Sequence, residues 1–174
     1  KRQREAGEAR NEGRRLQQRI VAIARAGGIR LMGPNCNGVI NFVDAFALTS
    51  TSTINGPRRP AGDIGIVSQS GGAGQINVMW RAHQAGLGIS YEVSCGNAAD
   101  IDLLDYAAYM VASPGTRVVL ILAEQLTDGG KLRALASRAA EIDKPLIMVK
   151  AGRTEAGSRA AAAAEVITTR FTPA

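Results

Sequence analysis

Apolar positions near the start of the chain recur at the spacing of a helix. Leu16, Ile20 and Ile23 lie three or four positions apart with charged residues between them, and Gly27-Gly28 follows. This spacing gives one apolar face, and glycine commonly ends a helix. We therefore predict a helix over residues 8–26. The next residues predict two short strands around a turn-rich loop: a strand at 29–32, a loop at 33–38 and a strand at 39–42.

Residues 44–61 are rich in Thr, Ser, Pro and Arg and show no periodicity. Such a stretch is typical of a linker, so we expect a first, incomplete unit to end near residue 55.

Short apolar runs then alternate with helical patterns. The expected strands are 63–67, 88–93, 117–123 and 145–149, and the expected helices are 71–85, 101–112, 129–142 and 155–164. Alternation of this kind predicts a parallel sheet with helices on both faces. The predicted fold class is α/β, a flavodoxin-like, doubly wound parallel sheet. Such sheets bind ligands at the carboxyl ends of their strands.

Composition narrows the class of protein. With 174 residues, 45% of them hydrophobic and 21% charged, the chain is neither collagen-like nor intrinsically disordered. The longest strongly apolar run, Val118 to Ala123, is far shorter than a membrane span, so we expect no membrane association. The two cysteines, Cys36 and Cys95, have no CxxC spacing. We therefore expect neither a disulfide framework nor a metal site, and we expect the protein to reside in the reducing cytoplasm.

The net charge of +6 is confined to the start of the chain. Residues 1–30 hold nine Lys or Arg and three Glu, and the remainder is balanced. The first aromatic residue is Phe42, so no base-stacking platform accompanies this charge. We interpret the segment as a solvated helix face. The alternative, a basic arm that binds nucleic acid, predicts an affinity that falls steeply with salt.

A turn rich in small residues follows the strand at 63–67. Ser68, Ser70, Gly71 and Gly72 lie where a strand meets the start of a helix. The free N–H groups of a helix start favour an anion, so these residues are candidates for phosphate binding without a Walker lysine. The alternative is that Ser68 or Ser70 only caps the helix.

The same turn resembles a degraded nucleophile elbow, with Ser70 as the attacking hydroxyl of a hydrolase. That fold needs a histidine late in the chain. The only histidine is His83, in the helix that directly follows the turn, and this excludes the hydrolase.

Other strand ends also carry polar residues. Gly96 and Asn97 suit a tight loop near the ligand. Asp100 and Asp102 could hold a metal ion or start a helix, and we favour the helix start. Glu124 ends an apolar strand, where its carboxylate could orient an imidazole or simply turn into solvent. The segment 150–153 adds positive charge suited to phosphates.

Taken in order, five segments resemble the nucleoside-diphosphate-forming acyl-CoA synthetases, which include ADP-forming acetyl-CoA synthetase and the succinyl-CoA synthetase alpha subunit. The segments are Gly33-Pro-Asn-Cys-Asn-Gly38, Ser68-Gln-Ser-Gly-Gly72, Gly96-Asn-Ala-Ala-Asp100, Glu124, and the stretch from Lys144-Pro145 to Gly157. The resemblance extends over residues 16–162.

The resemblance implies a division of the chain and a set of site residues. Residues 1–55 would be the C-terminal part of a CoA-binding Rossmann domain, 62–164 a flavodoxin-like ligase domain, and 165–174 an atypical tail. It places Asn35, Cys36 and Gly38 near the CoA thiol. The turn at 68–72 matches the segment that holds a phosphohistidine, and Glu124 matches the glutamate that orients it.

In this family, acyl-CoA and phosphate give an acyl phosphate, which phosphorylates a histidine that then phosphorylates ADP. The resemblance thus implies CoA and phosphate as ligands, with ADP or ATP and magnesium supplied through a partner ATP-grasp domain or beta subunit. The family's Ser-His-Thr-Gly is absent here, and Glu165 to Ala174 stands in its place. We expect a fragment that is inactive by itself, either with a truncated or out-of-frame tail or as a binding or partner-docking module.

Overall fold

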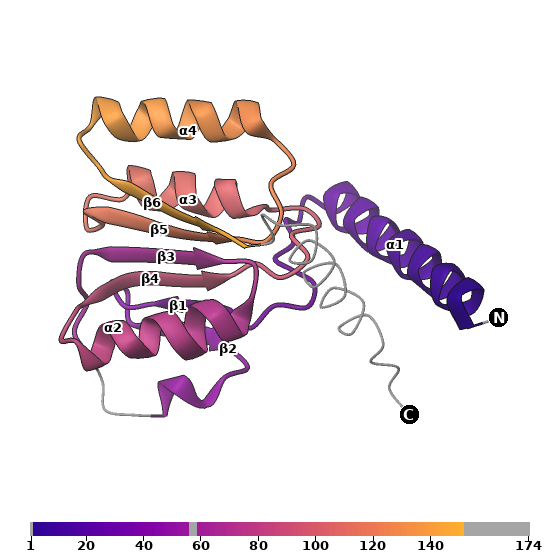
Figure 1. Ribbon diagram of the computed structural model, residues 1–174, viewed down its shortest axis with the longest axis horizontal. Helices are drawn as coiled ribbons and strands as arrows, with labels where there is room; N and C mark the ends of the chain where they lie inside the picture. Colours follow the sequence, from indigo (N-terminus) through magenta and orange to yellow (C-terminus); the bar gives the residue numbers. More distant parts are fainter. Residues whose placement is uncertain (1, 56–58, 152–174) are drawn as a thin grey trace.

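The computed structural model describes residues 2–55 and 59–151. Its centre is a six-stranded sheet with the order β2-β1-β4-β3-β5-β6 (Figure 1). The strands are β1 (Gly38–Asn41), β2 (Phe46–Thr49), β3 (Ile64–Ser68), β4 (Ile89–Ser94), β5 (Val118–Ala123) and β6 (Leu146–Lys150).

The predicted α/β, flavodoxin-like fold is confirmed, but the sheet is mixed rather than wholly parallel. Strands β4, β3, β5 and β6 run parallel, whereas β1 pairs antiparallel with both β2 and β4. The hairpin of β1 and β2 therefore extends the parallel sheet at one edge.

Two expectations for the part of the chain before β3 are wrong. The supposed linker at 44–61 contains β2 and the short helix η1 (Ser52–Ile54). Strand β2 is held by backbone pairing with β1 and most of its side chains are exposed, so it leaves no alternating pattern in the sequence. Residues 29–32 form no strand, because Leu31 instead bonds the loop before α3 through its carbonyl and its N–H.

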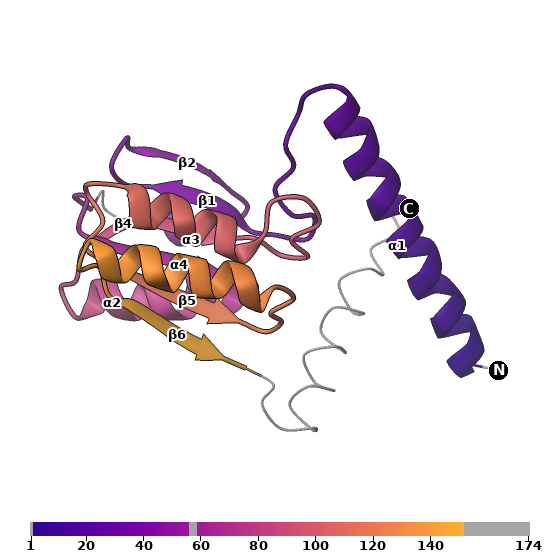
Figure 2. The ribbon, with the colours of Figure 1, turned by 90° about the horizontal axis from the view of Figure 1, so that it is seen from above.

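Helices cover both faces of the sheet (Figures 1 and 2). Helices α3 (Leu103–Ala112) and α4 (Gly129–Glu141) lie on one face, and η2 (Gly72–Met79) with α2 (Trp80–Gln84) lies on the other. The helix expected at 71–85 is thus present, but its first part, η2, is a π-helix. The helix expected at 155–164 and the tail at 165–174 lie outside the described residues.

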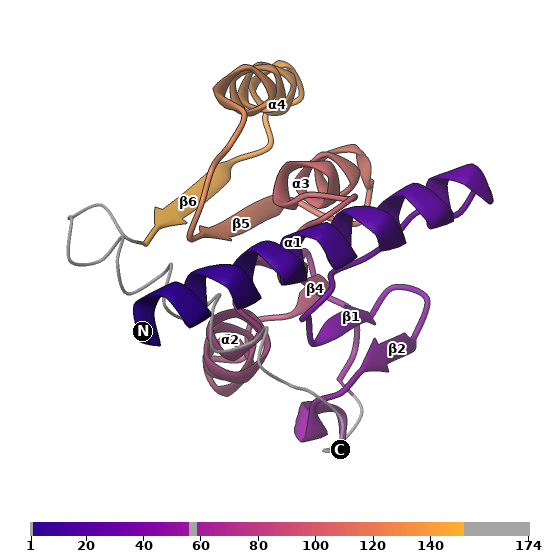
Figure 3. The ribbon, with the colours of Figure 1, turned by 90° about the vertical axis from the view of Figure 1, so that its right-hand side faces the viewer.

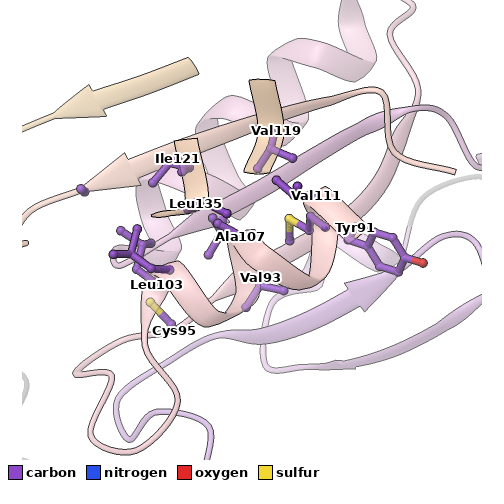
Figure 4. Close-up of a cluster of buried hydrophobic side chains, with 14 residues drawn as sticks. Tyr91, Val93, Cys95, Leu103, Ala107, Val111, Val119, Ile121 and Leu135 are labelled. Atoms are coloured by element: carbon purple, nitrogen blue, oxygen red, sulfur yellow. The ribbon is translucent and has the colours of Figure 1, made fainter. Parts of the chain in front are cut away.

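The core has one cluster on each face. The larger lies under α3 and α4 and includes Val93, Ala107 and Ile121 (Figure 4). The smaller lies under η2 and includes Ile66 and Met79. Because both faces are covered, every residue of β4 is buried, which explains its lack of alternation.

Helix α1 (Arg2–Ala26) projects from the sheet near the carboxyl ends of the strands (Figures 2 and 3). The pairing of β1 with β4 places residues 38–49 in the same sheet as the later strands. The assignment of residues 1–55 to a CoA-binding domain stays a prediction. Among the described residues, no helix is long and apolar enough to cross a bilayer.

Candidate functional site

The turn after β3 is built by hydrogen bonds among its own residues. The Ser68 hydroxyl donates to the carbonyl of Ser70 at 2.7 Å and accepts from the N–H of Ser70 at 3.1 Å. Ser68 is fully buried, so its side chain shapes the turn from beneath. The Ser68 carbonyl accepts from Cys95 N–H at 2.8 Å, which fixes the turn against the end of β4.

The helix start itself remains accessible. Ser70, Gly71 and Gly72 are all partly exposed. The Ser70 hydroxyl accepts from the N–H of Ala73 at 3.4 Å, so the capping contact that the sequence left as the alternative is present. The N–H groups of a helix's first turn have no partner within the helix. This end of η2 therefore offers both N–H groups and a positive dipole end to an anion.

The loop at residues 33–38 packs directly against this turn and against the loop after β4. The Asn35 side-chain amide donates to Asn97 Oδ1 at 3.3 Å, and Asn97 N–H donates to the Pro34 carbonyl at 3.0 Å. Gly96 has a positive φ of 58°, and a methyl group there would lie 2.3 Å from the Asn35 carbonyl oxygen. The expected CoA-proximal residues and the expected site loop therefore form one surface.

Asn37 and Gly71 join this surface to the turn at residues 68–72, which we call the anion turn after the role predicted for it. A methyl group on Gly71 would lie only 2.1 Å from the Asn37 side-chain nitrogen. Sequence reasoning missed Asn37, because nothing in a turn-rich loop marks which residue contacts another segment.

The two cysteines near this surface are not activated thiols. Cys36 is half-buried, and burial raises its pKa. Burial also raises the pKa of Cys95 to about 12. Both thiols are therefore protonated at neutral pH, which argues against either as a nucleophile.

Glu124 lies at the same carboxyl end of the parallel strands, immediately after β5. Its N–H donates to Gln69 Oε1 at 2.5 Å, and its carbonyl accepts from Lys150 Nζ at 2.6 Å. Gln69 belongs to the anion turn, so this residue ties Glu124 to the helix start. The cation of Lys150 lies in the same layer, as the sequence suggested, while Arg153 lies outside the described residues.

The two aspartates after β4 have structural roles. Asp102 caps α3, with its side chain accepting from the N–H groups of Leu104 and Asp105. Asp100 pairs with Arg25 at 2.7 Å and with Arg30 at 2.9 Å. Within the described parts of the chain, no cluster of His, Cys, Asp and Glu could hold a metal ion.

Two further residues of interest lie away from the expected positions. His83 lies on α2, at the far end of the helical segment from Ser70, with its ring edge-on to Phe42. Glu92, in the middle of β4, is fully buried beneath Gly74, and neither carboxylate oxygen has a hydrogen-bond partner among the described residues. Its one sequence signal is a charged residue inside an otherwise buried strand.

Comparison with known proteins agrees with this architecture. The model of the succinyl-CoA ligase-like flavodoxin domain matches residues 61–170, more than half of the chain. The chain belongs to this family. The matched span includes the sheet from β3 onward, the turn at residues 68–72, Glu124 and Lys150.

Relatives in this family are acid–CoA ligases. The chain is 35% identical over 158 residues to the alpha subunit of ADP-forming acetate–CoA ligase I from Pyrococcus furiosus, and 33% identical over 156 residues to that of ligase II. These matches cover 90% of this chain but only 32% and 33% of the relatives. The chain therefore spans about a third of the length of these proteins.

Solved structures in the family share the fold. An acetyl-coenzyme A synthetase from Ca. Korarchaeum cryptofilum, in complex with phosphate and ADP, matches with a TM-score of 0.75 and 35% identity. The match covers 87% of this chain and 32% of that one. The same enzyme without ligands matches with a TM-score of 0.74.

Proposed function

We propose that this chain is a portion of a nucleoside-diphosphate-forming acid–CoA ligase that carries the phosphate turn and the loop near the CoA thiol. In the reaction of such a ligase, a phosphate oxygen attacks the acyl carbonyl of acyl-CoA, an acyl phosphate forms, and CoA leaves as its thiolate. The observation that carries the proposal is that three segments, residues 33–38, 68–72 and 95–97, meet at the carboxyl ends of β3 and β4.

The start of η2 fits a phosphate group. A methyl group on Gly72 would meet only the Ser70 hydroxyl, at 3.9 Å, so the space beside this glycine is open. Ser70, Gly71 and Gly72 would hold the phosphate through N–H groups and a hydroxyl, with Ser68 shaping the turn from below. The Lys150 ammonium adds a cation to the same edge.

The loop at residues 33–38 fits the thiol end of CoA. Asn35 is exposed, Cys36 and Gly38 are partly exposed, and the loop lies against the anion turn. CoA, when bound, supplies the thioester that phosphate attacks. The part of this chain is to hold the loop still, through the Asn35–Asn97 contact, beside the phosphate.

In the later steps of the reaction, the acyl phosphate phosphorylates a histidine, which then phosphorylates ADP. These steps require groups other than those of this chain. His83 is the only histidine and lies on α2, so the residue that Glu124 would orient is absent. We therefore infer that the chain does not phosphorylate ADP by itself. ADP, ATP and magnesium would enter through an ATP-grasp domain or beta subunit, in the cytoplasm.

Titration of the full chain with inorganic phosphate, followed by phosphorus NMR, tests the proposal. We expect saturable binding that is weakened at least about tenfold in Gly72→Ala, because the methyl group fills the space at the helix start. Gly129→Ala is the matched control. It adds a methyl group at the first residue of α4, 3.7 Å from its nearest neighbour, and should leave binding unchanged.

Equal phosphate binding by both variants, or no binding by the unaltered chain, would overturn the assignment of this turn. Incubation with labelled acyl phosphate separates the alternatives for the chain as a whole. An acid-labile phosphoryl label would show that the chain performs chemistry without the family's histidine. Binding of an ATP-grasp partner without any label would support the partner-docking module instead.

A further inference from the structure

A cavity lies away from the carboxyl ends of the parallel strands, between the β1–β2 hairpin and the helical segment η2–α2. Its volume is about 410 Å³. Its walls come from the β1–β2 hairpin, from η1 together with Arg59, and from one side of the helical segment η2–α2. Figure 3 shows the hairpin and α2 near each other below α1. Asn41, which lines it, pairs with Tyr91 of β4, whereas the anion turn contacts Cys95 beyond the end of that strand. The cavity is therefore separate from the site at the sheet edge.

The lining of this cavity is mostly apolar. Its principal apolar side chains are Phe42, Phe46, Ile54, Met79 and Trp80. Phe46 is 47% exposed and Trp80 is 50% exposed, so these rings face solvent rather than the core. A volume in the range of about 300–1,000 Å³, with aromatic walls and few polar groups, is typical of a small-molecule site.

The polar groups of the lining give the cavity a positive sign. Among the described residues that line it, Arg59 is the one charged residue, and none is Asp or Glu. The guanidinium donates to the His83 carbonyl at 3.4 Å, and among the described residues no carboxylate forms an ion pair with it. Burial and the neighbouring Arg59 lower the pKa of His83, so that ring is neutral at physiological pH. An unpaired guanidinium beside apolar walls matches a ligand with a carboxylate head and an apolar body.

We propose that this cavity binds a small carboxylic acid with an aromatic or branched apolar body. The carboxylate pairs with Arg59, and the body lies against the rings of Phe42 and Trp80. Because His83 is neutral, Arg59 is the cation that the described lining offers to the ligand. The site is independent of the proposed ligase chemistry, because it shares no residue with the anion turn or the loop at 33–38.

The chain carries a built-in reporter for this site. Trp80 is the only tryptophan in the sequence, and it lines the cavity. Titration of the full chain with phenylacetate should therefore give a saturable change in tryptophan fluorescence. Phenylacetamide, which has the same ring but no charge, should need at least about ten times the concentration, since it cannot pair with the guanidinium. Inorganic phosphate should leave the phenylacetate titration unchanged.

Variants identify the residue responsible. Arg59→Gln should weaken phenylacetate binding at least about tenfold, Arg59→Lys should retain part of it, and Arg81→Gln should bind as the unaltered chain does. Arg81 is the matched control because it lies next to Trp80 on α2 but is not among the residues that line the cavity. Circular dichroism establishes that each variant is folded.

Three results would overturn the proposal: no saturable change with phenylacetate, equal affinity for the amide, or undiminished binding by a folded Arg59→Gln variant. If that variant does not fold, the comparison of phenylacetate with phenylacetamide on the unaltered chain still tests whether the cavity recognises a carboxylate. Displacement of phenylacetate by phosphate would place the ligand at the anion turn instead and would equally refute it.

Discussion

Glu92 is the residue whose chemistry departs most from its surroundings. Burial raises the pKa of its carboxyl group from an ordinary value near 4.5 to about 8, and the neighbouring Gln75 side chain opposes this rise only in part. In the folded chain the group is therefore neutral at physiological pH, whereas in the unfolded chain it is ionised. The folded state thus holds a proton that the unfolded state has lost between these two pKa values.

This difference predicts how stability depends on pH. The free energy of unfolding should fall by up to about 1.4 kcal/mol for each pH unit between roughly 4.5 and 8, and level off above. Glu92→Gln, which keeps the shape but cannot ionise, should remove that fall and make the chain more stable than the unaltered one at pH 8. Urea unfolding at several pH values measures the free energy of unfolding of both chains.

Glu141→Gln is the control, because Glu141 is exposed on α4 beside Arg138. It should follow the unaltered chain at every pH. His83 also titrates in this range, but both variants retain it, so the difference between them reports Glu92. Parallel curves for Glu92→Gln and the unaltered chain would mean that the carboxyl group is solvated.

At the scale of elements, Asp100 joins the N-terminal segment to the loop before α3. Its side chain is fully buried and accepts from the Leu31 N–H at 2.8 Å as well as from Arg25 and Arg30. These contacts, led by that with Arg30, hold the pKa of Asp100 well below its usual range. The carboxylate thus orders the chain between α1 and the loop at 33–38.

Asp100→Asn should loosen this junction, because an amide lacks the charge that holds two guanidinium groups. We expect limited trypsin digestion to cut after Arg25 and Arg30 several times faster in the variant, while the sheet remains intact. Mass spectrometry of the early fragments identifies the cuts. Asp63→Asn is the control, since among the described residues the Asp63 side chain forms only an exposed pair with Arg117 at 3.5 Å. Equal cleavage in the two variants would contradict this role.

At the scale of the whole molecule, the described sheet is open at both edges. Strand β2 forms one edge and β6 the other. On β6, Ile147 is 53% exposed and Val149 is 54% exposed. An edge strand with apolar side chains is a template for pairing with another chain.

Ile147→Lys should therefore reduce self-association, because a charge on an edge strand opposes pairing with a second copy. Light scattering against protein concentration should show a lower apparent mass than for the unaltered chain, with an unchanged circular dichroism spectrum. Tyr109→Lys is the control. It changes a residue that is 61% exposed on α3, a helix on one face of the sheet and not an edge strand. An equal fall in both variants would assign the effect to net charge.

The sequence by itself determined the parallel part of the sheet, its covering helices and the strand-to-helix turn at residues 68–72. Apolar runs mark strands that are buried on both faces, and the small residues from Ser70 to Gly72 mark a strand-to-helix turn, so local pattern suffices for both. The family followed from motifs in register along the chain, and comparison with known proteins confirmed it.

Only the tertiary structure decided the rest. Strand β2 is fixed by backbone pairing with β1, and the irregular path at 29–32 by Asp100, a partner about seventy positions away. The contact of Asn37 with Gly71 and the burial of Glu92 likewise depend on segments distant in sequence. Periodicity records which face of an element is buried, but it does not record which distant backbone or side chain lies against it.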